Sequence, residues 1–107
     1  MSSITLALGW SSEVDILGMP RQRLTVRGRV QGMTLRAQTQ SQAQKFGLGG
    51  WIRNEPDGTV TMEAEGEASS LAALKTWLKS GTRWAKVEVV EVIEVPPNGE
   101  KDFVVRA

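Results

Sequence analysis

The sequence has 107 residues, with 13 Lys or Arg against 12 Asp or Glu for a formal net charge of +1, and it lacks cysteine, histidine and tyrosine. This length suits a single domain with a sizeable core, and a charge so close to zero gives no general attraction to nucleic acid or to a membrane surface. The missing residue types exclude disulfides, thiolate catalysis and metal sites built from cysteine or histidine.

The first 20 residues differ from the rest of the chain. Apolar residues alternate with small or polar ones from Ile4 to Trp10, which is a weak strand pattern, and Gly-Met-Pro at 18–20 then interrupts the chain. We expect residues 1–20 to be a poorly ordered extension without a catalytic role, and residues 21–107 to form the domain. The alternative is that Met19 is the biological start.

The location of the protein is predicted from what the sequence does not contain. No run reaches the roughly 20 apolar residues of a membrane helix. No basic residue precedes the apolar residues Ile4 to Leu8, as it would in a secretory signal. We therefore expect a cytoplasmic protein without membrane contact.

The first half of the domain is predicted to be strand, helix, strand. Apolar residues at a two-residue period indicate a strand from Leu24 to Val30. Apolar positions three and four residues apart indicate a helix from Leu35 to Phe46, with Gly47 as its C-terminal cap. A second strand follows from Leu48 to Arg53.

The second half is predicted to repeat this order after a turn. Pro-Asp-Gly predicts the turn, because proline fixes φ and glycine supplies a positive φ. The elements expected next are a strand at Thr59–Ala64, a helix capped by Ser69 or Ser70 with the apolar stripe Leu71, Leu74, Trp77 and Leu78, a strand at Ala85–Val95 and a short strand at Phe103–Arg106. The order βαββαβ with a closing strand predicts an α+β, ferredoxin-like two-layer sandwich, in which two helices cover one face of a mainly antiparallel sheet.

The junction between the first strand and the first helix, GRVQGMTLR at 28–36, is suited to binding an anion. Backbone N–H groups at a helix start lack partners and the helix dipole adds partial positive charge. Arg36 adds a guanidinium that can hold two phosphate oxygens. An isolated arginine near a helix start is more often structural, so the motif gains weight only from its neighbours in sequence.

A second glycine-containing stretch, GWIRNEPDGTV at 50–60, follows the first one in the sequence. Together the two stretches resemble the acylphosphatase family, which carries a Gly-x-Val-Gln-Gly-Val-x-Phe-Arg loop followed by Gly-aromatic-x-basic-Asn-x-x-x-Gly-x-Val. The resemblance covers the chain from about Arg21 to Ala107, and the two motifs occur in the family's order.

The resemblance implies a function and the residues that perform it. It implies metal-free hydrolysis of acyl phosphates to a carboxylate and inorganic phosphate, with no cofactor. The phosphate would lie in the loop of Gln31, Gly32, Met33, Thr34, Leu35 and Arg36. Asn54 would orient the attacking water; read from the residues alone, it is a turn-flanking asparagine.

The loop departs from the family pattern at three positions. Met33 replaces valine, Thr34 stands where many members have glycine, and Leu35 replaces an aromatic residue. Thr34 would be strained if its φ had to be positive, because its side chain is β-branched. A catalytically impaired module that binds an anion or a protein is therefore the alternative function.

Two further alternatives fit less well. The first is the small domain of a hydrogenase-maturation carbamoyltransferase. Such a protein continues into zinc-finger and nucleotide-binding regions, and this sequence has no cysteine to form a zinc finger. A nucleic-acid-binding module of this topology would display aromatic residues on its central strands, whereas Trp51 and Trp77 are expected to pack in the core and Trp84 to lie in a loop. We expect a monomer that binds no nucleic acid.

Overall fold

The computed structural model describes residues 19–82 and 85–107. The predicted N-terminal extension and Trp84 lie outside the described residues, so the domain boundary after residue 20 stays a prediction. Met19 and Pro20 precede the first strand.

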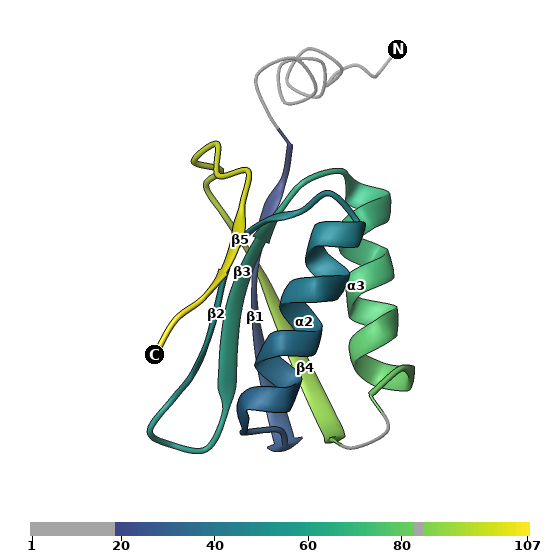
Figure 1. The fold of residues 1–107 in the computed structure, drawn as a ribbon. Coiled ribbons are helices and arrows are strands. Elements are labelled where there is room, and N and C mark those ends of the chain that lie inside the picture. The colour runs from purple at the N-terminus through teal and green to yellow at the C-terminus, as the bar shows by residue number, and fades with distance from the viewer. Residues whose placement is uncertain (1–18, 83–84) are drawn as a thin grey trace.

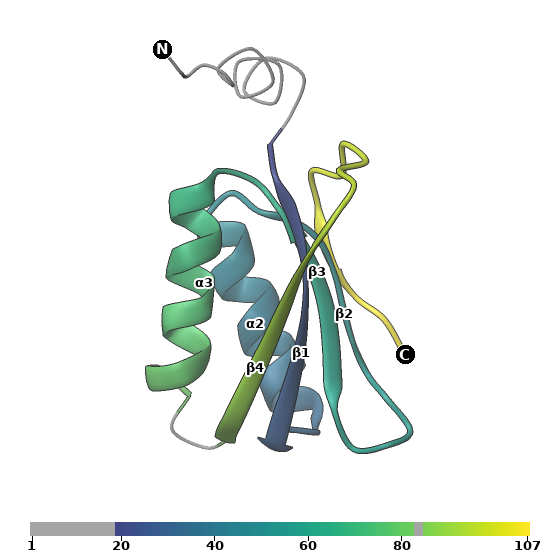
Figure 2. The same ribbon diagram turned by 180° about the vertical axis from the view of Figure 1, so that it is seen from behind.

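Two helices lie against one face of a five-stranded sheet (Figures 1 and 2). In chain order the elements are β1 (Arg21–Arg29), α2 (Met33–Lys45), β2 (Gly49–Asn54), β3 (Val60–Glu65), α3 (Ala68–Ser80), β4 (Lys86–Val95) and β5 (Phe103–Val105). The strand order is β4-β1-β3-β2-β5, with every pair antiparallel except β2 with β5. The predicted ferredoxin-like sandwich is confirmed.

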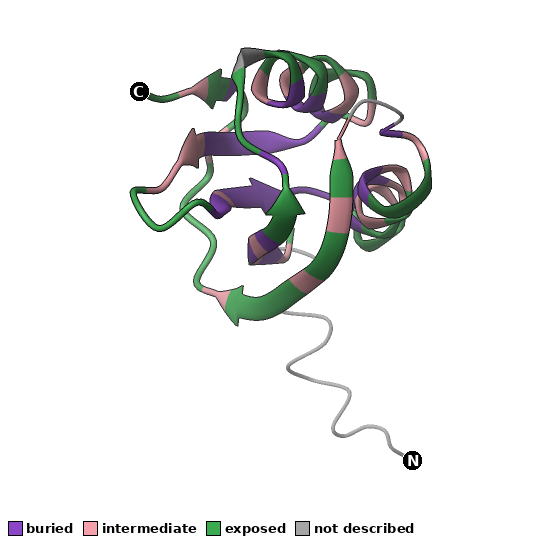
Figure 3. Ribbon diagram, turned by 90° about the horizontal axis from the view of Figure 1, so that it is seen from below, coloured by how far each residue is buried: buried purple, intermediate pink, exposed green. Residues whose placement is uncertain are grey.

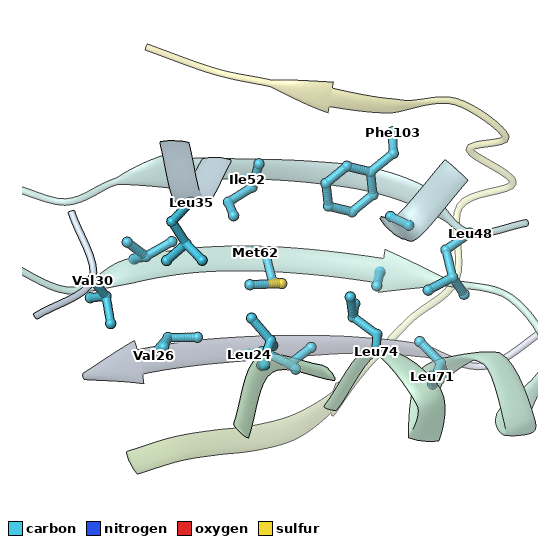
Figure 4. Close-up of a cluster of buried hydrophobic side chains, with 14 residues drawn as sticks. Leu24, Val26, Val30, Leu35, Leu48, Ile52, Met62, Leu71, Leu74 and Phe103 are labelled. Atoms are coloured by element: carbon cyan, nitrogen blue, oxygen red, sulfur yellow. The ribbon is translucent and has the colours of Figure 1, made fainter. Parts of the chain in front are cut away.

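The core lies between the sheet and the two helices. The residues that point into it alternate along β1 and β3, and recur every three or four residues along α3. Buried side chains from both layers meet there (Figure 4): Leu24, Val26, Leu35, Ile52, Met62, Leu71, Leu74, Leu78 and Phe103. Figure 3 shows that the inner sides of the helices and the central strands are buried, whereas the edge strand β4 is mostly exposed.

The two tryptophans that the structure describes, Trp51 and Trp77, are both shielded from solvent, but on opposite faces of the sheet. Trp77 is partly buried against the core at the stripe of α3. Trp51 is only 7% exposed. It lies on the helix-free face of the sheet, because the adjacent residue, Ile52, points into the core.

The starts of the helices differ from the prediction. The first helix begins at Met33 rather than Leu35, directly after Gly32, which has φ 134° and offers no side-chain cap. The prediction that Ser69 or Ser70 caps the second helix is wrong. That helix begins at Ala68 after an extended Glu67, whose carbonyl accepts the Leu71 N–H at 3.0 Å, so the helix forms as soon as the chain leaves the sheet.

The ends of the helices and the central turn agree closely with the prediction. Gly81 is the C-cap of α3. Phe46 is the C-cap of α2, one residue before the predicted Gly47, which follows it with φ 74°. The predicted turn is confirmed, with Gly58 at φ 94° and its N–H donating to the Glu55 carbonyl at 3.2 Å.

One end of the sheet holds a buried cluster of charges. Arg21 is 2% exposed and its guanidinium bonds Glu63 at 2.7 Å and Glu65 at 2.9 Å. Burial alone raises the pKa of both glutamates, but hydrogen bonds outweigh it and hold each pKa below its ordinary value. These bonds come from Arg21 and Arg23 for Glu63, and from the Asn98 N–H and Arg21 for Glu65.

The cluster predicts a loss of stability in acid. A carboxyl whose pKa is lowered by folding adds stability above its unfolded pKa, about 4.3 for glutamate, and this is lost as pH falls through the folded pKa. We expect Glu65→Gln to lower the free energy of unfolding by about 2 kcal/mol at neutral pH, and the deficit to narrow as pH falls to about 3. Urea titrations at several pH values measure this; the exposed Glu67→Gln should match wild type throughout, and a deficit that widens in acid contradicts the assignment.

The packing of β2 against β3 predicts a second effect. Gly50 has φ 137°, and a Cβ at this position would overlap the backbone carbonyl of Glu63 on the neighbouring strand. We expect Gly50→Ala to lower the free energy of unfolding by more than about 3 kcal/mol. Gly58→Ala is the matched control: its φ is also positive, but apart from the adjacent residues no described atom lies within 4 Å of the added methyl, so it should cost only about 1–2 kcal/mol. Equal losses would show that steric overlap at Gly50 is unimportant.

Candidate active site

Strand register brings the two sequence motifs to one end of the sheet. Val26 of β1 pairs with Val60 of β3, and Val60 pairs with Asn54 at the end of β2. Neighbouring strands lie about 4.8 Å apart, so Asn54 is about 10 Å from Val26 across the sheet. The loop that follows β1 therefore lies beside the β2–β3 turn.

Backbone N–H groups at the start of α2 form one side of the site. Gly32 is the N-cap and has no side chain to act as a cap, so the first N–H groups of the helix donate no hydrogen bond to a capping side chain. No acidic residue lies in the first turn. A helix start of this kind attracts an anion through its free N–H groups and its dipole.

Gln31 joins the loop to the turn. Its side-chain Nε2 donates to the backbone carbonyls of Glu55 at 2.6 Å and Thr59 at 3.0 Å. The predicted phosphate-loop residue therefore fixes the loop with its side chain, and its contribution to an anion site comes from position rather than from a free donor.

Arg36 has both a fixed and an unused part. Its Nη1 donates to the backbone carbonyl of Arg106 at 3.0 Å. Its Nε is buried and has no hydrogen-bond partner among the described residues. Because Nε and Nη2 share one edge of the guanidinium, this edge can receive two oxygens of an anion.

Asn54 has a similar unused atom. Its Oδ1 is buried without a hydrogen-bond partner in the described part of the chain. Asn54 shares its face of β2 with Ile52, which points into the core, so its side chain lies on the side of the sheet that α2 covers. A buried acceptor without a partner costs free energy, and such a cost is expected where a ligand or water binds.

The carboxylates of the adjacent turn are already engaged. The Asp57 carboxylate accepts the Thr59 hydroxyl at 2.6 Å and the Thr59 N–H at 3.0 Å. These bonds hold the pKa of Asp57 below its ordinary value, and a hydrogen bond from Arg53 does the same for the pKa of Glu55. Both groups are ionised at neutral pH, so neither is a proton donor there.

Two further loop residues, Thr34 and Leu35, lie in different environments. Leu35 is buried in the core, as predicted, and Thr34 is exposed. Met33 and Thr34 lie in the first turn of α2, where φ is negative. The positive φ falls on Gly32 instead, so the β-branched Thr34 carries no strain.

Comparisons with known proteins agree with this arrangement. A profile of the family described as Acylphosphatase matches residues 22–105. The chain belongs to the acylphosphatase family. It is 43% identical over 83 residues to an acylphosphatase of Nocardioides sp., covering 78% of this chain and 84% of that protein. It is 46% identical over 81 residues to one of Pseudomonas paraeruginosa, covering 76% and 89%.

A solved structure extends the agreement to three dimensions. The crystal structure of an acylphosphatase from Bacillus subtilis superposes with a TM-score of 0.79 at 34% identity, covering 83% of this chain and all of that one. The family and the fold implied by the two motifs are both confirmed, and the chain is an acylphosphatase hydrolase.

Sequence reasoning missed one partner in this acylphosphatase. Nothing in the local sequence near Ala107 indicates that the Arg106 carbonyl bonds Arg36. The Arg106 guanidinium stacks on Trp51 with 4.7 Å between Cζ and the ring centroid, and Arg53 stacks on the same ring at 5.0 Å. An arginine that follows Trp51 by two residues is the only sequence signal for this arrangement.

The conformation of Thr34 yields a prediction about stability. If Thr34 were strained, Thr34→Gly would stabilise the protein. Because Thr34 is helical, we expect the substitution to lower the free energy of unfolding by up to about 1 kcal/mol, as glycine does elsewhere in a helix. Ser41→Gly, at an exposed position of α2, is the control and should give a similar loss in urea unfolding. A gain in stability at Thr34 alone would overturn the helical assignment.

Proposed function

We propose that this acylphosphatase hydrolyses the carboxyl–phosphate bond of small acyl phosphates without a metal ion, with Arg36 and the loop at 31–36 holding the phosphate and Asn54 orienting the water. One observation carries the proposal. Two buried polar atoms without partners in the described residues, Arg36 Nε and Asn54 Oδ1, come from the two motifs that the register brings to the same end of the sheet.

Phosphate binding follows from the donors at the helix start. The first N–H groups of α2 and the free edge of Arg36 supply hydrogen bonds to phosphate oxygens. A cation in the first turn of a helix opposes the helix dipole. A bound phosphate offsets that repulsion, because its negative charge attracts both the Arg36 guanidinium and the positive end of the helix dipole.

The attacking water is oriented by an amide. Asn54 Oδ1 accepts a hydrogen bond from the water and leaves a lone pair on the water oxygen for the phosphorus. An amide keeps this geometry at every physiological pH because it does not titrate.

The leaving group explains why no acid or base is required. Water oxygen bonds to phosphorus, the bond from phosphorus to the acyl oxygen breaks, and the electron pair leaves with a carboxylate whose conjugate acid has a pKa of about 4. The water proton passes to a phosphate oxygen. Positioning and charge stabilisation then supply most of the catalysis, as is usual for phosphoryl transfer.

The structure gives less support to the alternative function, a catalytically impaired module that binds an anion or a protein. It rested on the altered segment Met33-Thr34-Leu35, and neither Thr34, which is helical and exposed, nor Leu35, which is buried in the core, disturbs the helix start. The same turnover experiment separates it from the enzyme, because an impaired module binds phosphate without hydrolysing an acyl phosphate.

Partners and location remain part of the proposal. Neither helix in the described residues is long and apolar enough to span a membrane. We propose a monomer in the cytoplasm that acts on a small molecule and binds no nucleic acid.

Hydrolysis of benzoyl phosphate, followed by ultraviolet absorbance in EDTA, tests the proposed function. We expect wild-type turnover that phosphate inhibits competitively. Asn54→Ala should lower kcat about 100- to 1,000-fold, and Arg36→Ala should lower kcat/KM by at least as much, since each removes a preorganised group.

Arg27→Ala provides the matched control for Arg36→Ala. Arg27 is exposed on β1, and in the described part of the chain its only side-chain hydrogen bond is a 3.3 Å one to Glu91, so its loss should leave turnover unchanged. Circular dichroism must show that every variant is folded. Absence of turnover in folded wild type, or full activity in Asn54→Ala, would overturn the proposed mechanism.

A further inference from the structure

Arg21 lies at the opposite end of the sheet from the active site and bonds four side chains. Its Nε donates to Glu63 at 2.7 Å, its Nη1 to Glu65 at 2.9 Å and to Asn98 at 3.0 Å, and its Nη2 to Glu100 at 2.6 Å. A guanidinium that is 2% exposed carries a large desolvation cost unless its donors are paired. Each of its three nitrogens has an acidic partner here.

These bonds tie a loop to the sheet. Glu63 and Glu65 belong to β3, whereas Asn98 and Glu100 belong to the connection between β4 and β5. Glu65 also accepts the backbone N–H groups of Asn98 at 2.9 Å and Gly99 at 2.8 Å. Residues 98–100 are therefore held to β1 and β3 through both their backbone and their side chains.

The same loop leads directly into the strand that contacts Arg36. Arg106 is six positions after Glu100, which is about 20 Å of extended chain. Along that length the Asp102 carbonyl accepts the Gly50 N–H at 2.9 Å and the Arg106 N–H donates to Ile52 at 2.8 Å. The Arg106 carbonyl then accepts Arg36 Nη1 at 3.0 Å.

The strand itself has few other attachments. β5 has three residues, lies at the edge of the sheet and, within residues 19–82 and 85–107, pairs only with β2. Its interior contacts are the buried Phe103, the partly buried Val105 and a hydrogen bond from Gln40 to the Phe103 carbonyl at 2.9 Å. Short edge strands open locally at low free energy, so a firm anchor at one end limits that opening.

We propose that Arg21 is a positioning residue for the active site: it anchors the loop at 98–100, which holds β5 and thereby keeps the Arg106 carbonyl against Arg36. The inference rests on the proposed function in that Arg36 binds the phosphate. With Nη1 held, the guanidinium turns its Nε–Nη2 edge in one direction. Without the anchor, Arg36 samples other orientations and binds phosphate more weakly.

The loop side of the cluster is the place to test this. Replacing Arg21 would leave Glu63 and Glu65 buried without a cation and could unfold the protein. The double variant Asn98→Ala/Glu100→Gln instead removes the Asn98 side-chain amide and the charge of Glu100, and it leaves Arg21 paired with both glutamates of β3. Glu94→Gln is the matched control: it removes one carboxylate at the same end of the sheet, where Glu94 accepts Gln22 at 2.6 Å and lies outside the loop.

Two measurements are needed on the full chain. Amide hydrogen exchange reports the opening of residues 102–106, and calorimetric titration with inorganic phosphate reports the dissociation constant. We expect the double variant to exchange faster in β5 but not in β1 or β3. We expect its phosphate dissociation constant and its KM for benzoyl phosphate to rise about five- to tenfold with kcat within about twofold, because ground-state and transition-state binding fall together. Glu94→Gln should match wild type in every measurement.

Other outcomes overturn the inference in distinguishable ways. Unchanged exchange in β5 means that the cluster does not hold the strand. Faster exchange with unchanged phosphate affinity means that Arg106 does not position Arg36, and a loss of thermal stability alone means a purely structural role. If wild type binds phosphate without turnover, the proposed function fails but the phosphate titrations still decide this inference; a wild type that binds no phosphate overturns both.

Discussion

The antiparallel pairing of β1 with β3 is the constraint on which the site depends. It puts the end of β1 beside the start of β3, and β3 in turn pairs with β2 so that Val26, Val60 and Asn54 lie across one line of the sheet. A slip of one residue would turn Asn54 away from the side covered by α2. The core prevents such a slip, because it would also expose Leu24, Met62 and the other inward residues.

The two ends of this sheet carry different electrostatics. At one end Arg21 has acidic partners for each of its nitrogens. At the other, Arg36 keeps a buried Nε without a partner in the described chain, near a helix start that repels its charge. A buried charge whose nitrogens all make hydrogen bonds, such as Arg21, stabilises one arrangement of the chain. A charge with a buried but unused donor, such as Arg36, can still bind a ligand. The edge strand β5 runs between these two environments.

The composition of the protein suits its chemistry. Hydrolysis of an acyl phosphate releases a weakly basic carboxylate, so a catalyst of this reaction needs no histidine or cysteine, and this chain has neither. The carboxylates of the adjacent turn, Glu55 and Asp57, are held ionised by hydrogen bonds and stabilise the turn. In the mechanism that we propose, catalysis depends on how firmly an amide, backbone N–H groups and one guanidinium are placed.

The sequence by itself determined the fold class, the family and the loop that leads into α2, since two-residue and three- to four-residue periods and two glycine-containing motifs are local patterns. It did not determine the cap of α3, because the helix there begins where Gly66 and Glu67 leave the sheet rather than at a capping serine. Only the tertiary structure decided that Arg106 contacts Arg36 across 70 residues, that Gln31 bonds the turn, and that Arg21 has partners up to 79 residues away. Such contacts depend on strand order and register, which are set by the packing of the whole sheet and leave no local pattern in the sequence.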